Sequence, residues 1–363
     1  MQLRFTAYNC GTGYNRNAPD EVVADLNRET LSLHMITDGV GSRWYQVSGK
    51  LGGVGADANV DAVVSEVVRR AAQVRSMVLN MCGWSRGAVT CIKIANKLNG
   101  DPATSGIPVN IFAIDPVPGG AAINNHMWQS INMTGNIKMC NVVLSQHDRR
   151  SLFTPYYPPV LGPFTDVDIM PGDHSTIVEK HKGRSEAYEL VKDMAKRFLM
   201  ARGTVFKSNT LLTPAEILTR YALIAEHFDD YAHVAKGAGM FFGSRFEGAR
   251  PIKGVKPFDD PKSPEAILAR LGDKRQEIAK LLPVKPQFFL NEHHRMVFQQ
   301  LFPALTNEID YPPEKAFSIT NHRAWSEEFI RLMESGMVEQ FKMCLTYYMA
   351  CVAKQAKTLK AAA

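Results

Sequence analysis

The sequence lacks the features that mark membrane-spanning, disulfide-stabilised and zinc-binding proteins. No window approaches the run of about 20 apolar residues that crosses a bilayer, and residues 1–5 lack the basic-then-apolar layout of a signal peptide. The six cysteines form no CxxC pair, and no HExxH pattern occurs. We therefore expect reduced, mostly buried thiols, no metal, no cofactor, and a protein made in the cytosol that stays there or leaves by a signal-independent secretion system.

A large excess of one charge sign is also missing. Of the 363 residues, 21% are charged and 45% are hydrophobic, which is typical of a soluble globular protein. The formal net charge of +6 mildly favours an anionic membrane surface such as phospholipid head groups, although general solubility explains it equally well. We expect no nucleic-acid partner, and the length is sufficient for two domains.

The first part of the chain, residues 1–204, alternates strand-like and helix-like segments, which predicts an α/β domain with a mostly parallel sheet flanked by helices. The expected strands cover 3–8, 32–37, 77–82, 109–114, 141–145 and 167–170, and the expected helices cover 59–72, 86–98 and 185–200.

Residues 205–363 lose the strand pattern and predict an all-helical C-terminal domain. Its first helix begins at Thr213-Pro214-Ala215-Glu216, where Thr213 is the N-cap and Glu216 completes a capping box. The later elements are a connection over 237–261 and helices over 264–282, 292–301 and 324–354. The function and the partner of this domain are not indicated by its pattern.

One segment carries a catalytic pattern. An apolar strand over 77–82 leads into Gly-Trp-Ser-Arg-Gly at 83–87, followed by an apolar helix. Gly-x-Ser-x-Gly between a strand and a helix is typical of a nucleophile elbow, a tight turn that exposes a serine hydroxyl at the edge of the sheet. The two glycines leave room for the helix to approach the strand. We predict Ser85 as the nucleophile; an ordinary turn is the alternative, because the pattern also occurs by chance.

A serine nucleophile needs a base, which in α/β-hydrolases follows the serine and the acid in chain order. His174 lies in the turn 169–175, after the last expected strand, where such a base belongs. The alternative is a solvated loop histidine. The other histidines, including His293 and His294 in the helical part, fit this role less well.

Two carboxylates compete for the acid. Asp115 ends the strand 109–114, and the carboxyl ends of parallel strands are where sites form. Asp148 follows the next strand, beside two arginines that could pair with it. We prefer Asp115, since a carboxylate that ends a short apolar strand is expected to be buried. Its alternative role is that of a turn residue before Pro116.

The oxyanion hole is expected to use the backbone N–H of Arg86, directly after the serine, and a donor from an early loop. The loop 9–15 follows the first strand and contains Gly11 and Thr12, our candidates for this second donor. A phosphate-binding loop is the rival interpretation, but the Lys-Ser or Lys-Thr of a P-loop is missing.

Taken in order, these blocks resemble one family: the α/β-hydrolases with a Gly-Phe-Ser-Arg-Gly elbow that include phospholipase effectors of the bacterial type VI secretion system. The resemblance covers about residues 1–180. The matching blocks are 10–15 (Cys-Gly-Thr-Gly-Tyr-Asn), 39–41 (Gly-Val-Gly), 52–55 (Gly-Gly-Val-Gly), 83–88 (Gly-Trp-Ser-Arg-Gly-Ala), 115–117 (Asp-Pro-Val), 147–150 (His-Asp-Arg-Arg) and 171–175 (Pro-Gly-Asp-His-Ser).

The resemblance implies Ser85 as nucleophile, His174 as base and Asp115 as acid, in a lipase-like or phospholipase-like hydrolase. Two departures bear on activity. Cys10 replaces the early aspartate of the family, and Thr176-Ile177 follow His174 and Ser175 where the family continues with an acid and glycines.

The expected function is therefore cleavage of a carboxylic ester or phospholipid by a Ser-His-Asp triad, in a protein exported to a target or host cell. An aromatic and proline-rich loop over 153–161 is a candidate cover for an acyl chain. The alternative is a hydrolase-fold interaction protein with weak or no catalysis, which acts through its helical C-terminal domain.

Overall fold

The computed structural model describes residues 2–42, 56–118, 134–145, 148, 165–180, 184–226 and 231. The elements within these ranges are β1 (Leu3–Asn9), α1 (Val22–Glu29), β2 (His34–Thr37), α3 (Ala56–Ala71), β3 (Met77–Trp84), α4 (Arg86–Asn99), β4 (Val109–Ile114), β5 (Ile137–Ser145), β6 (Thr165–Met170), α6 (Glu186–Ala201) and α7 (Pro214–Glu226).

The six strands form one sheet in the order β2-β1-β3-β4-β5-β6, and every neighbouring pair is parallel. The chain steps outward from β1 to β2 and then returns to place β3 on the other side of β1, so the order reverses between β1 and β3. In open parallel sheets, sites form at the carboxyl ends of the strands beside such a reversal. The fold is therefore α/β, and its topology predicts a site at the loops after β1, β3 and β4.

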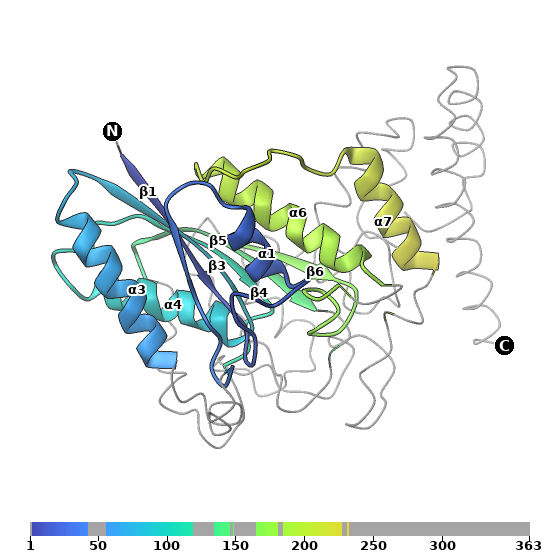
Figure 1. Ribbon diagram of the computed structural model, residues 1–363, viewed down its shortest axis with the longest axis horizontal. Coiled ribbons are helices and arrows are strands. Elements are labelled where there is room, and N and C mark those ends of the chain that lie inside the picture. The colour runs from blue at the N-terminus through green and yellow to red at the C-terminus, as the bar shows by residue number, and fades with distance from the viewer. Residues whose placement is uncertain are drawn as a thin grey trace.

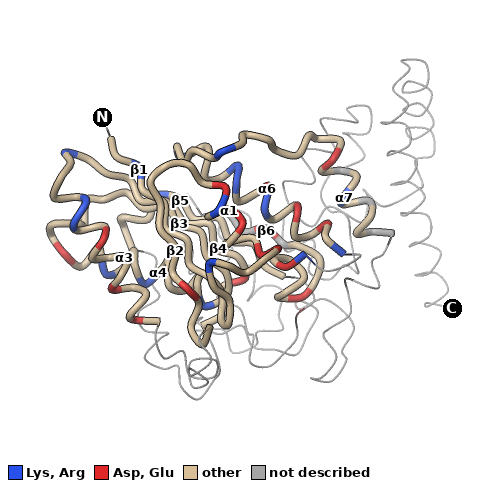
Figure 2. Tube along the Cα trace, viewed as in Figure 1, with Lys and Arg blue, Asp and Glu red and all other residues tan. Residues whose placement is uncertain are grey.

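Helices cover both faces of the sheet (Figure 1). One apolar cluster joins α1, α6 and α7 to side chains such as Tyr8, Cys82 and Phe112. The other joins α3 and α4 to side chains such as Leu79 and Met81. Neighbouring residues of β3 thus enter opposite clusters, as the period of two in a strand requires. Charged residues lie mainly on the helices and loops around the sheet (Figure 2).

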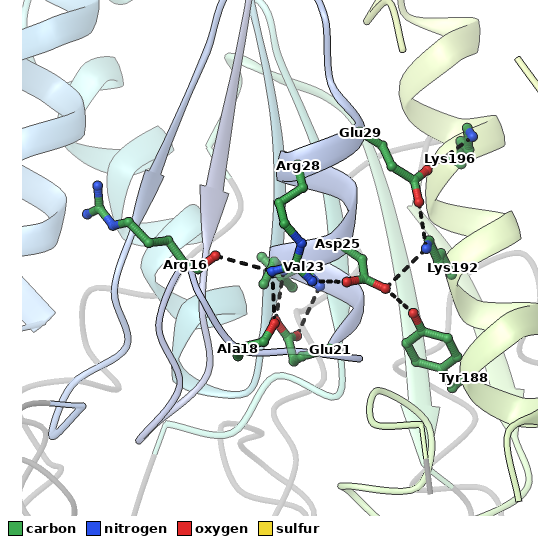
Figure 3. A network of polar contacts seen from close by, with 11 residues as sticks. Arg16, Ala18, Glu21, Val23, Asp25, Arg28, Glu29, Tyr188, Lys192 and Lys196 are labelled. Atoms are coloured by element: carbon green, nitrogen blue, oxygen red, sulfur yellow. Dashed lines mark hydrogen bonds and ion pairs between the residues drawn. The ribbon is translucent and has the colours of Figure 1, made fainter. Parts of the chain in front are cut away.

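A charged network joins α1 to α6 across the first of these layers (Figure 3). Lys192 of α6 places its Nζ 3.1 Å from Asp25 Oδ2 and 2.7 Å from Glu29 Oε1 on α1. Lys196 also contacts Glu29, and the hydroxyl of Tyr188 donates to Asp25. Burial lowers the pKa of Lys192, but the two carboxylates outweigh this and leave its pKa raised.

Most elements predicted for residues 1–204 are present, and the strands are generally longer than predicted. The expected strand over 77–82 extends to Trp84, and the one over 141–145 begins at Ile137. The short helix α1 is absent from the predictions. Its N-cap is Glu21, a residue type that is not among the preferred N-caps, so the start signal is missing from the sequence.

The capping box that begins α7 is confirmed. Thr213 N donates to Glu216 Oε2 at 2.8 Å, and Glu216 N donates to Thr213 Oγ1 at 3.2 Å. The rest of the expected helical domain, with helices over 264–282, 292–301 and 324–354, lies outside the described residues, as do the connection over 237–261 and the loop over 153–161. The division at residue 204 stays a prediction.

The expectation about cysteines is confirmed for the part of the chain that the structure describes. Cys10, Cys82, Cys91 and Cys140 are free and buried. Within the described ranges, no helix is both long and apolar enough to cross a membrane.

Candidate active site

The Gly-x-Ser-x-Gly segment forms a one-residue turn between β3 and α4. β3 ends at Trp84 and α4 begins at Arg86, so Ser85 alone makes the reversal, with φ 58° and ψ −124°. Residues with a side chain rarely adopt a positive φ, and such strain costs on the order of 1–3 kcal/mol. The end of β4 holds the turn: Ser85 N donates to Ile114 O at 2.9 Å, and Val117 N donates to Ser85 O at 3.3 Å.

The two glycines of the motif are required by close packing. A Cβ atom on Gly83 would lie 2.5 Å from the carbonyl oxygen of Gly87. A Cβ atom on Gly87 would lie 2.0 Å from the carbonyl oxygen of Asn9, at the end of β1. The start of α4 is therefore pressed against both β3 and β1, which is the arrangement expected of an elbow.

His174 and Asp115 are brought together across the carboxyl ends of the strands. His174 Nδ1 lies 2.6 Å from Asp115 Oδ2, although 59 residues separate them. Asp115 is fully buried and its carboxylate also accepts Ser145 N at 3.0 Å and Ser145 Oγ at 2.9 Å. A carboxylate at Nδ1 favours the tautomer that has its proton on that nitrogen, and in this tautomer Nε2 carries the lone pair that acts as a base.

The backbone at Asp115 is also strained, with φ 38°. Ser85, Asp115 and Asp20 are the non-glycine residues with positive φ in the described ranges. Two of these three residues lie at neighbouring strand ends of one sheet edge. Backbone strain of this kind clusters at functional sites, because the surrounding structure must hold it in place.

Asp148, the second candidate for the acid, contacts a different part of His174. The backbone N–H of His174 donates to Asp148 Oδ2 at 3.3 Å, whereas the ring nitrogen meets Asp115. Asp148 is 1% exposed. The two candidate acids thus contact the same histidine, Asp115 at its ring and Asp148 at its backbone N–H.

The turn that carries His174 is held by the preceding residue. Asp173 Oδ1 accepts the backbone N–H groups and the hydroxyls of both Ser175 and Thr176, at 2.8–2.9 Å. Burial alone would raise the pKa of Asp173, but the hydrogen bonds from Thr176 and Ser175 outweigh it and the pKa is lowered. Asp173 therefore stays ionised and fixes the loop.

The candidate oxyanion residues also lie together. Arg86 Nη1 donates to Thr12 Oγ1 at 3.1 Å, which links the start of α4 to the loop after β1. A Cβ atom on Gly11 would lie 2.4 Å from the indole ring of Trp84. Burial lowers the pKa of Arg86. The loop 39–42 contacts this loop as well, since Gly13 N donates to Val40 O at 3.0 Å.

The pattern predicts an exposed serine, and here the structure differs. Ser85 is 4% exposed and His174 is 3% exposed. The expectation of an exposed serine is therefore wrong for this conformation.

Three neighbours of the site are absent from the predicted site residues. Ser145 contacts Asp115, and Trp84 contacts both Tyr14 and His174: its ring centroid is 4.7 Å from that of Tyr14 and 5.1 Å from that of His174. Ser145 could have been suggested by its place at the end of a parallel strand. Trp84 occupies a variable position of the motif, so nothing marks it in advance.

In the described ranges, no group of three or more His, Cys, Asp or Glu side chains is placed to hold a metal ion.

The fold and this sheet edge define the class of architecture: a parallel α/β protein whose third strand leads through a strained serine into a helix. No protein-family model matches the chain, and no curated protein matches it significantly in sequence.

Among solved structures, the chain is similar to the Tle1 effector in a complex described as bound to the VgrG spike from the Type 6 secretion system. The identity is 13% and the TM-score 0.38, with 49% of this chain and 51% of the other covered. It is also similar to an uncharacterized protein from Pseudomonas aeruginosa, with 15% identity, a TM-score of 0.43, and 82% and 62% of the two chains covered. The chain thus spans less than two thirds of either structure, and neither likeness assigns a function to it.

Proposed function

We propose that this chain is a serine hydrolase that cleaves carboxylic esters, with Ser85 as nucleophile, His174 as base and Asp115 as acid. One observation carries the proposal: the strained serine turn after β3 lies beside a buried 2.6 Å contact between His174 and Asp115, at the end of the neighbouring strand. In acyl transfer, an imidazole oriented by a carboxylate takes the proton of the serine nucleophile, and the tight turn holds that serine in place.

In the proposed reaction, Ser85 Oγ attacks the ester carbonyl while Nε2 of His174 takes the hydroxyl proton. The negative charge on the carbonyl oxygen is stabilised by the N–H of Arg86, at the positive end of α4, and by an N–H of Gly11 or Thr12. His174 then returns the proton to the leaving alkoxide, and the acyl-serine is hydrolysed by a water molecule that His174 activates. Asp115 stabilises the imidazolium without taking its proton.

The finer proposal is a lipase-like or phospholipase-like effector delivered by a secretion system. It rests on the resemblance of the sequence blocks at 10–15, 83–88 and 171–175 to the effector family. The positive net charge is compatible with an anionic lipid surface. Growth of a bacterial competitor exposed to cells that secrete the wild-type chain or Ser85→Ala tests delivery and activity together.

The chemical test is labelling with a fluorophosphonate, which forms a covalent bond with an activated serine. We expect the wild type to be labelled at Ser85, and Ser85→Ala to remain unlabelled. Ser105→Ala is the matched control, because Ser105 is half-buried in the loop after α4 and its hydroxyl donates to the backbone carbonyl of Pro102 at 3.4 Å. No labelling of the wild type, together with no hydrolysis of short-chain or lipid esters, would refute the proposal.

A second candidate is an interaction protein that keeps the hydrolase fold. The burial of Ser85 and His174 favours it, since neither side chain is open to a substrate in this conformation. Full biological function in a Ser85→Ala variant would support this alternative, and loss of function together with loss of labelling would exclude it.

A further inference from the structure

We propose that Ser145 is a positioning residue for the pair formed by Asp115 and His174: its two donors hold the carboxylate of Asp115 in one plane, and its hydroxyl favours the state in which the imidazole of His174 is ready to take a proton. This inference rests on the proposed function, because it concerns the acid and the base of the proposed reaction.

Ser145 contacts both oxygen atoms of the Asp115 carboxylate. Its backbone N–H donates to Oδ1 at 3.0 Å, and its hydroxyl donates to Oδ2 at 2.9 Å. Oδ2 is also the atom that lies 2.6 Å from His174 Nδ1. Two donors from one residue on the two oxygens of a carboxylate restrict its rotation, because hydrogen bonds to an sp² oxygen prefer the plane of the group. Ser145 thus acts on the imidazole through Asp115.

The place of Ser145 in the sheet accounts for these contacts. Asp115 directly follows β4, and its backbone N–H donates to Val143 O of β5 at 2.7 Å. Ser145 is the last residue of β5 and is paired with Met170 at the end of β6, which leads into the turn that carries His174. β5 lies between β4 and β6 in the sheet. Its last residue therefore stands between the strand that carries the acid and the strand that leads to the base.

The contact between Ser145 and Asp115 is shielded from water. Both residues are 0% exposed. A buried carboxylate needs donors in place of the water molecules that it has lost, and a hydrogen bond to an ionised group is stronger than one between neutral groups. A buried hydroxyl likewise carries a cost when it has no partner. The hydroxyl and the carboxylate therefore each satisfy the other.

The Ser145 hydroxyl also affects the proton of the pair. Asp115 and His174 are in contact and titrate as one unit, which carries a negative charge when the imidazole is neutral and no net charge when it is protonated. A donor to a carboxylate oxygen favours the charged state. The hydroxyl therefore opposes uptake of a proton by the pair, and it keeps His174 in the neutral form that a base requires down to a lower pH.

Charged and titratable groups approach this pair from several elements. Asp148 faces the backbone N–H of His174 from beyond β5, and Asp173 precedes His174 in the same turn. Arg86, at the start of α4, reaches the loop after β1. Because Ser145 is uncharged, its replacement by alanine removes a hydrogen bond without adding or removing a charge among these groups.

The test compares Ser145→Ala with the wild type in the full chain. The substitution removes the hydroxyl and keeps the backbone N–H that donates to Asp115 Oδ1. The rate of fluorophosphonate labelling of Ser85 is measured from pH 5 to pH 9. We expect the acid limb of the profile to move to higher pH by about half a unit and the plateau to fall by about tenfold. An acid limb that stays in place, or that moves to lower pH, would overturn the proposal.

Two further variants separate the hydroxyl from packing. Ser145→Thr keeps a hydroxyl on the same carbon atom, so its acid limb should coincide with that of the wild type even if the added methyl group lowers the melting temperature. Thr6→Val removes a buried hydroxyl within β1, which lies 2.9 Å from Thr204 Oγ1, and should lower the melting temperature without moving the acid limb. A shift in either variant as large as that in Ser145→Ala would assign the effect to packing and contradict the role of the hydroxyl.

A direct readout is available without the reaction. In Ser85→Ala, the midpoint of the NMR titration of the His174 imidazole protons should rise by about half a unit when Ser145→Ala is added. The proposal requires this rise as well as the shift of the acid limb.

The two failures are distinguishable. If Ser85 is labelled in the wild type but Ser145→Ala moves neither the acid limb nor the NMR midpoint, Ser145 is a packing residue and the proposed hydrolase function stands. If the wild type is not labelled at Ser85 and hydrolyses no ester, the proposed function is refuted and the inference falls with it.

Discussion

The site edge of the sheet and the layer between α1 and α6 are made of similar side chains but differ in burial and strain. At the site edge, Asp115 meets His174, and their side chains are 0% and 4% exposed. Asp115 itself and the neighbouring Ser85 have positive φ. Between α1 and α6, Lys192 meets Asp25 and Glu29, whose side chains are 14% and 36% exposed. The two regions therefore share the pairing of a carboxylate with a nitrogen base and differ in burial and in backbone strain.

The largest expected effect sharpens this contrast. Asp115→Asn should lower the rate of fluorophosphonate labelling by about a thousandfold, because an amide can hold His174 in the wrong tautomer. The fold should remain, since Asn keeps the size of the side chain and can still accept from Ser145. The measurement is the labelling rate, with circular dichroism as the check on folding.

Asp148→Asn is the matched control for that substitution. The amide oxygen can still accept the backbone N–H of His174, so we expect a loss of about tenfold or less, which is the scale of one hydrogen bond. If Asp148→Asn abolishes labelling and Asp115→Asn does not, the assignment of the acid is reversed.

Glu21 is another buried carboxylate, and it tests how burial changes a carboxyl pKa away from the candidate site. It is fully buried at the N-terminus of α1, where its carboxylate accepts the backbone N–H groups of Val23 and Ala24 at 3.0 and 2.8 Å. Burial raises the pKa of Glu21 from 4.5 to about 7, although the two backbone hydrogen bonds act in the opposite direction.

The folded state therefore keeps a proton that the unfolded state has released between pH 4.5 and pH 7, and this contribution to stability is lost as the pH rises through that window. Wild type should lose about 3 kcal/mol of unfolding free energy relative to Glu21→Gln between pH 4 and pH 8. Urea unfolding of both proteins at the two pH values measures it. Parallel changes in the two proteins would contradict the raised pKa.

The smallest expected effect lies in the charged layer. Lys192→Met should lower the free energy of unfolding by about 1 kcal/mol, the upper range for partly exposed ion pairs, and leave labelling of Ser85 unchanged. Lys97→Met, which removes an exposed pair with Asp61, should change stability less. A large loss of labelling in Lys192→Met would show that the two regions are coupled, and would contradict their separation into a site edge and a charged layer.

The sequence predicts the elements well where apolar residues keep a regular period. The strand after 77 and the helix after 86 follow from that period and from the Gly-x-Ser-x-Gly pattern. The helix α1 does not, because it has eight residues and its N-cap is a buried glutamate. The ion pairs of α1 also come from α6, which is distant in the chain and cannot be read from a local pattern.

The same reasoning applies to the candidate site. The order of motifs selects Ser85, Asp115 and His174, and the structure places the last two in contact. It does not select Trp84 or Ser145, because their contacts depend on the alignment of β3, β4 and β5 side by side. Nor could it decide which atom of His174 each aspartate meets. That depends on the turn that Asp173 holds.

Selection for stability alone would favour glycine at residue 85. At φ 58° and ψ −124° a glycine backbone is relaxed, whereas any side chain is strained. Relaxing residue 85 and keeping its hydroxyl are therefore incompatible, and the same conflict exists for the carboxylate at residue 115. The fold gives up stability at two adjoining strand ends to keep these two side chains in place.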